Sequence, residues 1–206
     1  ERRHDRAGKS RAGVEANPHA ACRTVVGDAA VVGHKQIFGI FSRHPIRRAW
    51  ATCFPGETNG YCAAEIQAER GRILVYNLHL QSYGFGSCRG PKDIASSLKH
   101  GLEMRTRQSQ VVANDFFNHP LPTMVVGDFN DVPTSYTYNY FSQLDLQDGF
   151  LKVGQGLAAT HQTQARIDYI LADANWNFSE YHTLPTPSFL DHYWVVAELH
   201  LKNPEH

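Results

Sequence analysis

Short apolar runs recur along the chain, and those rich in β-branched and aromatic residues predict strands at residues 36–42, 65–67, 72–81, 123–127, 165–172 and 193–201. The first of these runs is expected to end at Pro45, because proline cannot donate to a ladder. Residues 73–80 are almost continuously apolar, so both faces of that strand are expected to be covered. Between the strands, apolar positions spaced by three and four predict a helix over residues 94–117, with Asp93 as its N-cap.

Strands interspersed with helices over this length predict an α/β or α+β sandwich. Residues 1–36 show neither sustained helical nor strand periodicity and are expected to be a poorly structured N-terminal segment, mostly loop with at most one short helix and one strand near residues 22–26. The domain is then expected to occupy residues 37–206. Gly8-Lys9-Ser10 does not make a phosphate-binding loop, because Arg3 stands where that motif needs a glycine.

The composition and the distribution of charge limit the classes of protein to which the chain can belong. The chain has 206 residues, of which 42% are hydrophobic and 19% charged, which fits one folded domain. No run is long enough to cross a membrane and the first twenty residues contain no apolar signal region, so we expect a soluble protein and favour the cytoplasm. Residues 51–206 hold 16 Asp and Glu against 10 Lys and Arg, which favours a metal site and excludes a DNA-coating protein.

The four cysteines, Cys22, Cys53, Cys62 and Cys88, show neither a CxxC pair nor zinc-ligand spacing. We expect all four to be reduced thiols.

Asp128 and Asn130 follow an apolar strand in the run Gly127-Asp128-Phe129-Asn130. Where a strand ends, polar side chains project into a crevice rather than into the core. A carboxylate and an amide there suit a hard cation with a water molecule, or a water held by both groups. The alternative is an Asx turn in which both side chains only cap backbone amides.

Three further polar positions also lie at strand ends. Asn77 and His79 share one face of their strand, although a lone histidine there is often only a core residue. Asp168 lies opposite its apolar neighbours and therefore needs a cationic or hydrogen-bonding partner. Asp191 and His192 directly precede the last strand, where they could also be an ordinary loop pair.

Taken together and in this order, these segments resemble the endonuclease/exonuclease/phosphatase superfamily, which includes deoxyribonuclease I, apurinic/apyrimidinic endonucleases, neutral sphingomyelinases and inositol polyphosphate 5-phosphatases. The resemblance covers about four-fifths of the chain. The segments that carry it are FGIFSRHPI (38–46), YNLHLQS (76–82), the helix segment with Arg107 and Gln110, VVGDFNDVP (125–133), RIDYIL (166–171) and LDHYWV (190–195).

The resemblance implies a deoxyribonuclease I-like sandwich of two packed mixed β-sheets flanked by helices. It also implies a hydrolase of phosphate esters that depends on Mg²⁺ or Mn²⁺. The substrate would be a nucleic acid, a lipid head group or a sugar phosphate, and we expect a monomer.

By the same resemblance, Asp128 and Asn130 would bind and orient the attacking water, with Asp128 as base or metal ligand and Asn130 also touching the metal and the phosphate. His192 would act on the phosphoryl group or as an acid or base. Asp168 would hold its ring, which fixes the tautomer and raises basicity.

Asp191 would be a further ligand of the metal or of a water molecule. His79 would donate to a phosphate oxygen, supported by Asn77. One departure from the family pattern is Leu190, which stands where members usually have serine.

A second departure concerns the N-terminus, where family members have two strands and a metal-binding glutamate. Neither strand is found before residue 38, so we expect the fold to be N-terminally incomplete, with Glu1 as the candidate for that glutamate. If the ligand is lost, the chain would be an impaired or truncated member that acts as a binding module. Retention of six site residues favours an enzyme, namely His79, Asp128, Asn130, Asp168, Asp191 and His192.

Overall fold

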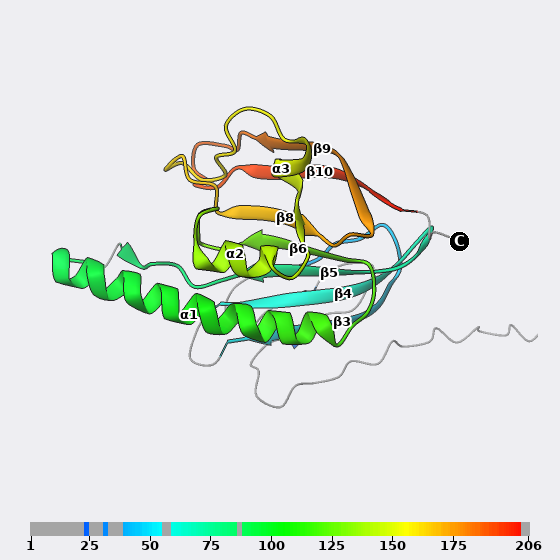
Figure 1. Cartoon of the computed structure of the whole chain (residues 1–206), viewed down its shortest axis with the longest axis horizontal. Coiled ribbons are helices and arrows are strands. Elements are labelled where there is room, and N and C mark those ends of the chain that lie inside the picture. Colours follow the sequence, from blue (N-terminus) through cyan, green and yellow to red (C-terminus); the bar gives the residue numbers. More distant parts are fainter. Residues whose placement is uncertain (1–22, 25–30, 33–38, 55–58, 86–87, 203–206) are drawn as a thin grey trace, which may run out of the picture.

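A computed structural model describes residues 23–24, 31–32, 39–54, 59–85 and 88–202 (Figure 1). In chain order the elements are β1 (Arg23–Thr24), β2 (Val31–Val32), β3 (Ile46–Cys53), β4 (Gly60–Ala68), β5 (Gly71–His79), α1 (Pro91–Phe117), β6 (Thr123–Asp128), α2 (Tyr136–Ser142), β7 (Gln147–Asp148), α3 (Gly149–Val153), β8 (Asp168–Ala172), β9 (Trp176–Leu184) and β10 (Trp194–Leu201).

The main sheet has six strands in the order β3-β4-β5-β6-β8-β7. β5 and β6 are parallel and the remaining neighbours are antiparallel, so the sheet is mixed. β9 and β10 form a separate antiparallel pair, and β1 pairs with β2. The predicted mixed α/β architecture with two packed sheets is confirmed.

Two hydrophobic cores lie on opposite faces of the main sheet. Tyr76 of β5 packs on one face with Val112 of α1, which runs alongside β3 to β5 (Figure 1). Ile73 of the same strand packs on the other face, with Trp176 and Leu199 from the β9–β10 pair. β5 is therefore covered on both faces, as its nearly continuous apolar run predicts.

The long helix begins slightly earlier than predicted and is capped differently. Gly90 is the N-cap and Pro91 occupies the first turn, where its missing N–H costs nothing. Asp93 lies inside the first turn, and its carboxylate accepts the backbone N–H of Arg89 at 3.0 Å. The prediction that Asp93 is the N-cap is wrong, although its charge still suits the helix N-terminus.

The strand predicted at residues 36–42 is wrong for its described part, residues 39–42. The Gly39 carbonyl accepts a hydrogen bond from the Asn77 side chain at 3.0 Å rather than from a neighbouring strand. The strand instead begins after Pro45 and forms β3, which the consecutive Arg47 and Arg48 conceal in the sequence pattern. A proline directly before a strand costs no ladder bond.

β9 and the short helices α2 and α3 were not predicted from the sequence. Only Trp176 and Tyr181 of β9 are buried, so the strand lacks an alternating pattern. Its partner is the predicted strand at 193–201, which pairs with β9 in the second sheet and does not close the main one.

Cys53 is disulfide-bonded, whereas Cys62 and Cys88 are free thiols. The expectation of four reduced cysteines is therefore wrong, because sequence spacing does not report which residues meet in the fold. No helix among the described residues is long and apolar enough to span a membrane. Glu1, Cys22 and the run Gly8-Lys9-Ser10 lie outside the described residues.

A buried ion pair ties α1 to the loops after β5 and β6. Arg105 and Asp131 are 0% and 2% exposed, and the Arg105 Nε donates to Asp131 Oδ2 at 2.9 Å. Arg105 also donates to the Gln81 carbonyl at 2.8 Å and lies 4.0 Å over the Tyr83 ring. The Tyr83 and Thr137 hydroxyls donate to the two Asp131 carboxylate oxygens, which compensates burial of the charge.

The network also shows which polar residues of the long helix face inward. Arg107 and Gln110 are exposed, while Arg105 and Gln108 face inward. The Gln108 side-chain oxygen accepts the Gln81 backbone N–H at 2.8 Å. Both pairs have the same i, i+3 spacing, so the sequence could not distinguish them.

Replacing Arg105 with alanine should lower the free energy of unfolding by about 3–5 kcal/mol, because it leaves the Asp131 carboxylate buried without its cation. Urea unfolding followed by circular dichroism measures this. Arg107→Ala is the matched control on the exposed side of the same helix, with an expected change below about 0.5 kcal/mol. Equal losses for the two variants would contradict the role assigned to the ion pair.

Candidate active site

Strand pairing brings three predicted site residues to one edge of the main sheet. His79 ends β5 and is in register with Asp128, which ends the parallel strand β6. Asp128 is in turn opposite Asp168, which begins the antiparallel strand β8. One row across three neighbouring strands thus carries a histidine and two carboxylates.

The turn after β6 depends on glycine. Gly127 has φ of +122°, and a Cβ there would lie 2.1 Å from the Leu78 carbonyl oxygen of the neighbouring strand. Asn130 has φ of +51°, a conformation that asparagine tolerates better than most residues. This turn lets the Asn130 backbone N–H and side-chain amide donate to the Asp128 carboxylate at 2.7 and 2.9 Å.

Asn130 is also tied to the strand end on its other side. Its Nδ2 donates to the Leu80 carbonyl at 2.9 Å as well as to Asp128. Because Nδ2 makes both bonds, the amide oxygen is the atom left to face a water or a cation.

His192 approaches this row from the loop before β10. Its Nδ1–H donates to Asp168 Oδ2 at 2.9 Å, so the pairing expected from the resemblance is present. The hydroxyl oxygen of the fully buried Thr160 accepts the backbone N–H groups of Ile167 and Asp168. The Thr160 carbonyl accepts the N–H of Tyr193, which joins both partners of the pair to one loop.

The second ring nitrogens of two histidines converge on Asp128. Nε2 of His79 lies 3.6 Å and Nε2 of His192 lies 3.9 Å from Asp128 Oδ2. The Asp128 carboxylate is therefore the centre of the constellation.

The three groups have shifted pKa values. Burial, followed by the nearby Asp168 charge, raises the pKa of Asp128 to about 7. The hydrogen bond to Asp168 raises the pKa of His192 to about 9, against the effect of burial. Burial and the neighbouring His192 lower the pKa of His79.

A cleft of about 810 Å³ opens over this row. Its polar lining includes Asp128 and Asp191, together with Asp131, whose charge Arg105 compensates from below, and none of the described lining residues is Lys or Arg. The cleft is thus acidic, and its remaining wall is largely apolar. The lining residues are His79, Ser82, Tyr83, Gly84, Phe85, Leu98, Asp128, Asn130, Asp131, Val132, His161, Thr163, Ala165, Ile167, Asp191 and His192.

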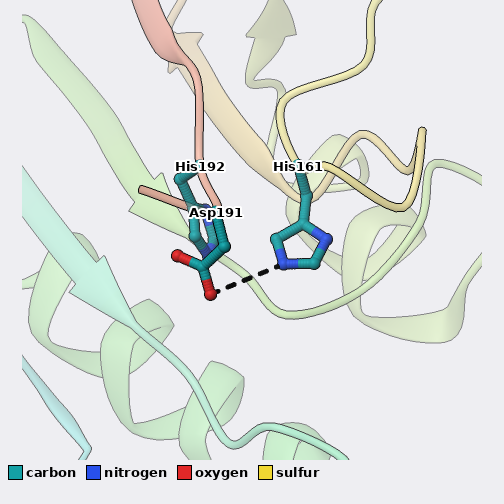
Figure 2. A group of neighbouring side chains, drawn as sticks. All are labelled: His161, Asp191 and His192. Carbon is teal, nitrogen blue, oxygen red and sulfur yellow. Dashed lines mark ion pairs between the residues drawn. The ribbon is translucent and has the colours of Figure 1, made fainter. Parts of the chain in front are cut away.

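Asp191 lies at the mouth of the cleft with its side chain 64% exposed. Its Oδ2 is 3.8 Å from Nε2 of His161, a residue of the loop between α3 and β8 (Figure 2). The His161 and His192 rings meet edge to face at 4.9 Å. Sequence reasoning missed His161, because a loop histidine outside any motif carries no signal of its tertiary neighbours.

One predicted site residue stands apart from the cleft. Asn77 holds the Gly39 carbonyl, and it is not among the described lining residues. Leu190, which replaces the usual serine, is 42% exposed. Glu1 lies outside the described residues, so its predicted role as a metal ligand stays untested.

A family model for the Endonuclease/Exonuclease/phosphatase family matches residues 16–192, which is most of the chain. The chain belongs to this family. No curated protein is similar enough in sequence to count as a match. The family resemblance carried by the strand-end residues is confirmed.

Solved structures of the family agree in fold. A mannosyl-6-phosphatase of Bacteroides thetaiotaomicron is 21% identical, with a TM-score of 0.53 over 69% of this chain and 57% of its own length. A 3′ phosphatase from Neisseria bound to a product DNA hairpin is 17% identical, with a TM-score of 0.58 over 77% and 73%. The human Nocturnin catalytic domain is 21% identical, with a TM-score of 0.52 over 80% and 63%.

The chain spans little more than half the length of the Bacteroides phosphatase. At these identities the comparisons establish the deoxyribonuclease I-like fold. Two of the neighbours are phosphatases by name, so phosphate-ester hydrolysis is chemistry that this family fold supports.

In the family site, Asp168→Asn should lower the pKa of His192 from about 9 toward its ordinary 6.5, because the neutral amide removes the charge that favours the imidazolium. A raised histidine pKa stabilises the folded chain most below pH 6.5, and this stabilisation disappears as the pH rises through about 9. NMR titration of the His192 ring in chelator measures the shift. The exposed Asp145→Asn variant is the control, and an unchanged titration in Asp168→Asn would refute the pairing.

Gly127→Ala should destabilise the chain more than Gly71→Ala. Both glycines have positive φ, which costs an alanine about 1–3 kcal/mol. Only at Gly127 does the added Cβ also meet backbone, whereas nothing lies within 4 Å of one at Gly71. We expect a further loss of about 1–3 kcal/mol at Gly127 in thermal or urea unfolding. Similar losses at both positions would show that β5 and β6 separate readily there.

Proposed function

We propose that the chain is a metal-dependent hydrolase of phosphate esters, acting as a phosphodiesterase, nuclease or phosphatase. One observation carries the proposal: Asp128, His79 and the His192–Asp168 pair converge in an acidic cleft whose described lining holds no Lys or Arg. Family membership supports the same class of reaction.

A divalent cation fits the chemistry of the cleft. A phosphate ester is an anion, and an acidic cleft repels it unless a cation lies between them. Burial and the neighbouring Asp168 charge raise the pKa of Asp128, and a cation bound beside the carboxylate would stabilise its charged form. Asp128 and the Asn130 amide oxygen would hold Mg²⁺ or Mn²⁺, with Asp191 nearby, since these ions prefer oxygen ligands. When bound, the ion neutralises charge on the phosphoryl oxygens.

Asp128 and Asn130 orient the attacking water. The Asp128 carboxylate is fixed by two hydrogen bonds from Asn130, so its position does not depend on the substrate. Without an ion bound to it, Asp128 has a pKa of about 7 and is matched to accept a proton from water at neutral pH; base and metal ligand are alternative roles for this carboxylate. The Asn130 amide oxygen can accept the second proton of the same water in a hydrogen bond.

His192 serves the phosphoryl group as an imidazolium. Because Asp168 raises its pKa to about 9, the ring is protonated at neutral pH. Its Nε2–H then faces the cleft, where it donates to a phosphate oxygen or gives its proton to the leaving alcohol. His79, whose pKa is lowered, stays neutral and donates one N–H to the same phosphate.

The apolar wall suits the organic part of the ester. Tyr83 and Phe85 stack at 5.1 Å with an interplanar angle of 4°, and Phe85 remains 47% exposed. Leu98 and Val132 add further exposed apolar surface to the lining. This wall favours esters whose alcohol portion is flat or apolar over densely charged head groups.

Hydrolysis of bis-(p-nitrophenyl) phosphate by the purified chain should require Mg²⁺ or Mn²⁺ and stop in chelator. Asp128→Asn and His192→Gln should each lower kcat by about 10²–10⁴-fold, the range for losing an acid or base. His182→Gln is the control, because this exposed histidine pairs with Glu180 far from the cleft. Turnover in Asp128→Asn close to that of the unsubstituted chain would exclude the proposed base.

A double variant tests whether Asp168 acts through His192. If it does, Asp168→Asn with His192→Gln should be little slower than His192→Gln alone, because the two residues work as a unit. Losses that multiply would show that Asp168 acts independently.

A further inference from the structure

Two neighbouring histidine rings are each held through Nδ1, while Nε2 of His161 lies 3.8 Å from Asp191 and Nε2 of His192 lies 3.9 Å from Asp128. Nδ1 of His192 is bound to Asp168 at 2.9 Å. Nδ1 of His161 lies 2.8 Å from the Thr163 hydroxyl oxygen and 3.2 Å from the Thr163 backbone nitrogen. Nδ1 accepts the Thr163 backbone N–H when the ring proton is on Nε2. In the other tautomer Nδ1–H donates to the Thr163 hydroxyl oxygen, and Nε2 is then free to bind an ion on the side of Asp191.

Such an anchor on the inner nitrogen is a usual companion of a metal-binding histidine, since it fixes ring orientation. Here both rings have one. The backbones of His161 and His192 are also joined by an antiparallel bridge, which fixes the spacing of the two side chains. The rings are thus held by backbone and side chain alike.

Asp191 supplies the third donor. One ligand atom each from His161, Asp191 and His192 lies within 4.8 Å of the others. Asp128, Asp168 and His192 form a separate group, so the two clusters share only His192. The exposed Asp191 side chain turns toward His161 from the strand side of the cleft (Figure 2).

We propose that His161, Asp191 and His192 form a site for a transition-metal ion of the Zn²⁺ class. Two imidazole nitrogens and one carboxylate suit Zn²⁺ and Co²⁺, whereas Mg²⁺ prefers oxygen donors such as Asp128 and Asn130. The negative charges of Asp128 and Asp168, the latter 2.9 Å from His192, add attraction for a divalent ion.

Occupation of this site inhibits the enzyme. An ion held by Nε2 of His192 takes the nitrogen that the phosphate ester needs, so Zn²⁺ and substrate compete. This consequence rests on the proposed function, whereas the binding site itself does not.

Zn²⁺ binding is measured by calorimetry with Mg²⁺ present throughout, in a Cys88→Ser background that removes a half-buried free thiol. His161→Gln and Asp191→Asn should each weaken Zn²⁺ binding at least tenfold. His182→Gln, which alters an exposed histidine–carboxylate pair of the second sheet, should leave it unchanged. Unchanged affinity in His161→Gln, or no binding in the parent chain, overturns the proposal.

If His161→Gln fails to fold, NMR of the parent chain tests the site instead. Zn²⁺ should shift the ring signals of His161 and His192 together at one equivalent. Shifts confined to other histidines overturn the site.

Enzyme activity provides a second test. Zn²⁺ should inhibit Mg²⁺-supported hydrolysis in the parent chain, and His161→Gln should need at least tenfold more Zn²⁺ for the same inhibition. Binding without inhibition refutes the competition at His192 while the site stands. If no phosphate ester is hydrolysed, the proposed function fails and the calorimetry still decides the site.

Discussion

The pairing of β6 with both of its neighbours is the constraint on which the site depends. His79, Asp128 and Asp168 come together because one residue position on three adjacent strands falls in a single row. The close approach of Gly127 to the Leu78 carbonyl maintains this register, since a side chain there would push the strands apart. A shift of one residue would turn these groups to the opposite face of the sheet.

Negative charge concentrated by this register explains the other properties of the cleft. Asp128 is buried beside Asp168, so its proton is held more tightly than usual, and the same carboxylates favour the cationic form of His192. A site of this kind stores unfavourable electrostatic energy that a cation and an anionic substrate relieve together. Contacts outside the row hold its carboxylates in place, notably the buried Arg105–Asp131 ion pair.

Local signals in the sequence predicted the elements that carry the chemistry. Each of these signals lies within one segment of the chain: the apolar runs of β5 and β6, and the helical periodicity of α1. The strand-end residues Asp128 and His192 matched a family pattern. Features set by tertiary neighbours were not predicted. β3 is hidden by its two arginines, and burial alone distinguishes Arg105 from Arg107. His161 becomes part of the site only because its loop pairs with the residues before β10.

The hydrogen-bonded pair at the heart of the site is divided between two sheets. Asp168 begins a strand of the main sheet, whereas His192 lies two residues before β10 of the second. The interface between the sheets is largely apolar, and directional bonds cross it at its ends, from Arg70 to the Leu201 carbonyl and from Tyr193 to the Thr160 carbonyl. A shear of about one ångström between the layers that stretched these bonds would also separate His192 from Asp168 while every strand stays intact. Catalytic activity should therefore respond to a change in the packing between the two sheets before the secondary-structure content does.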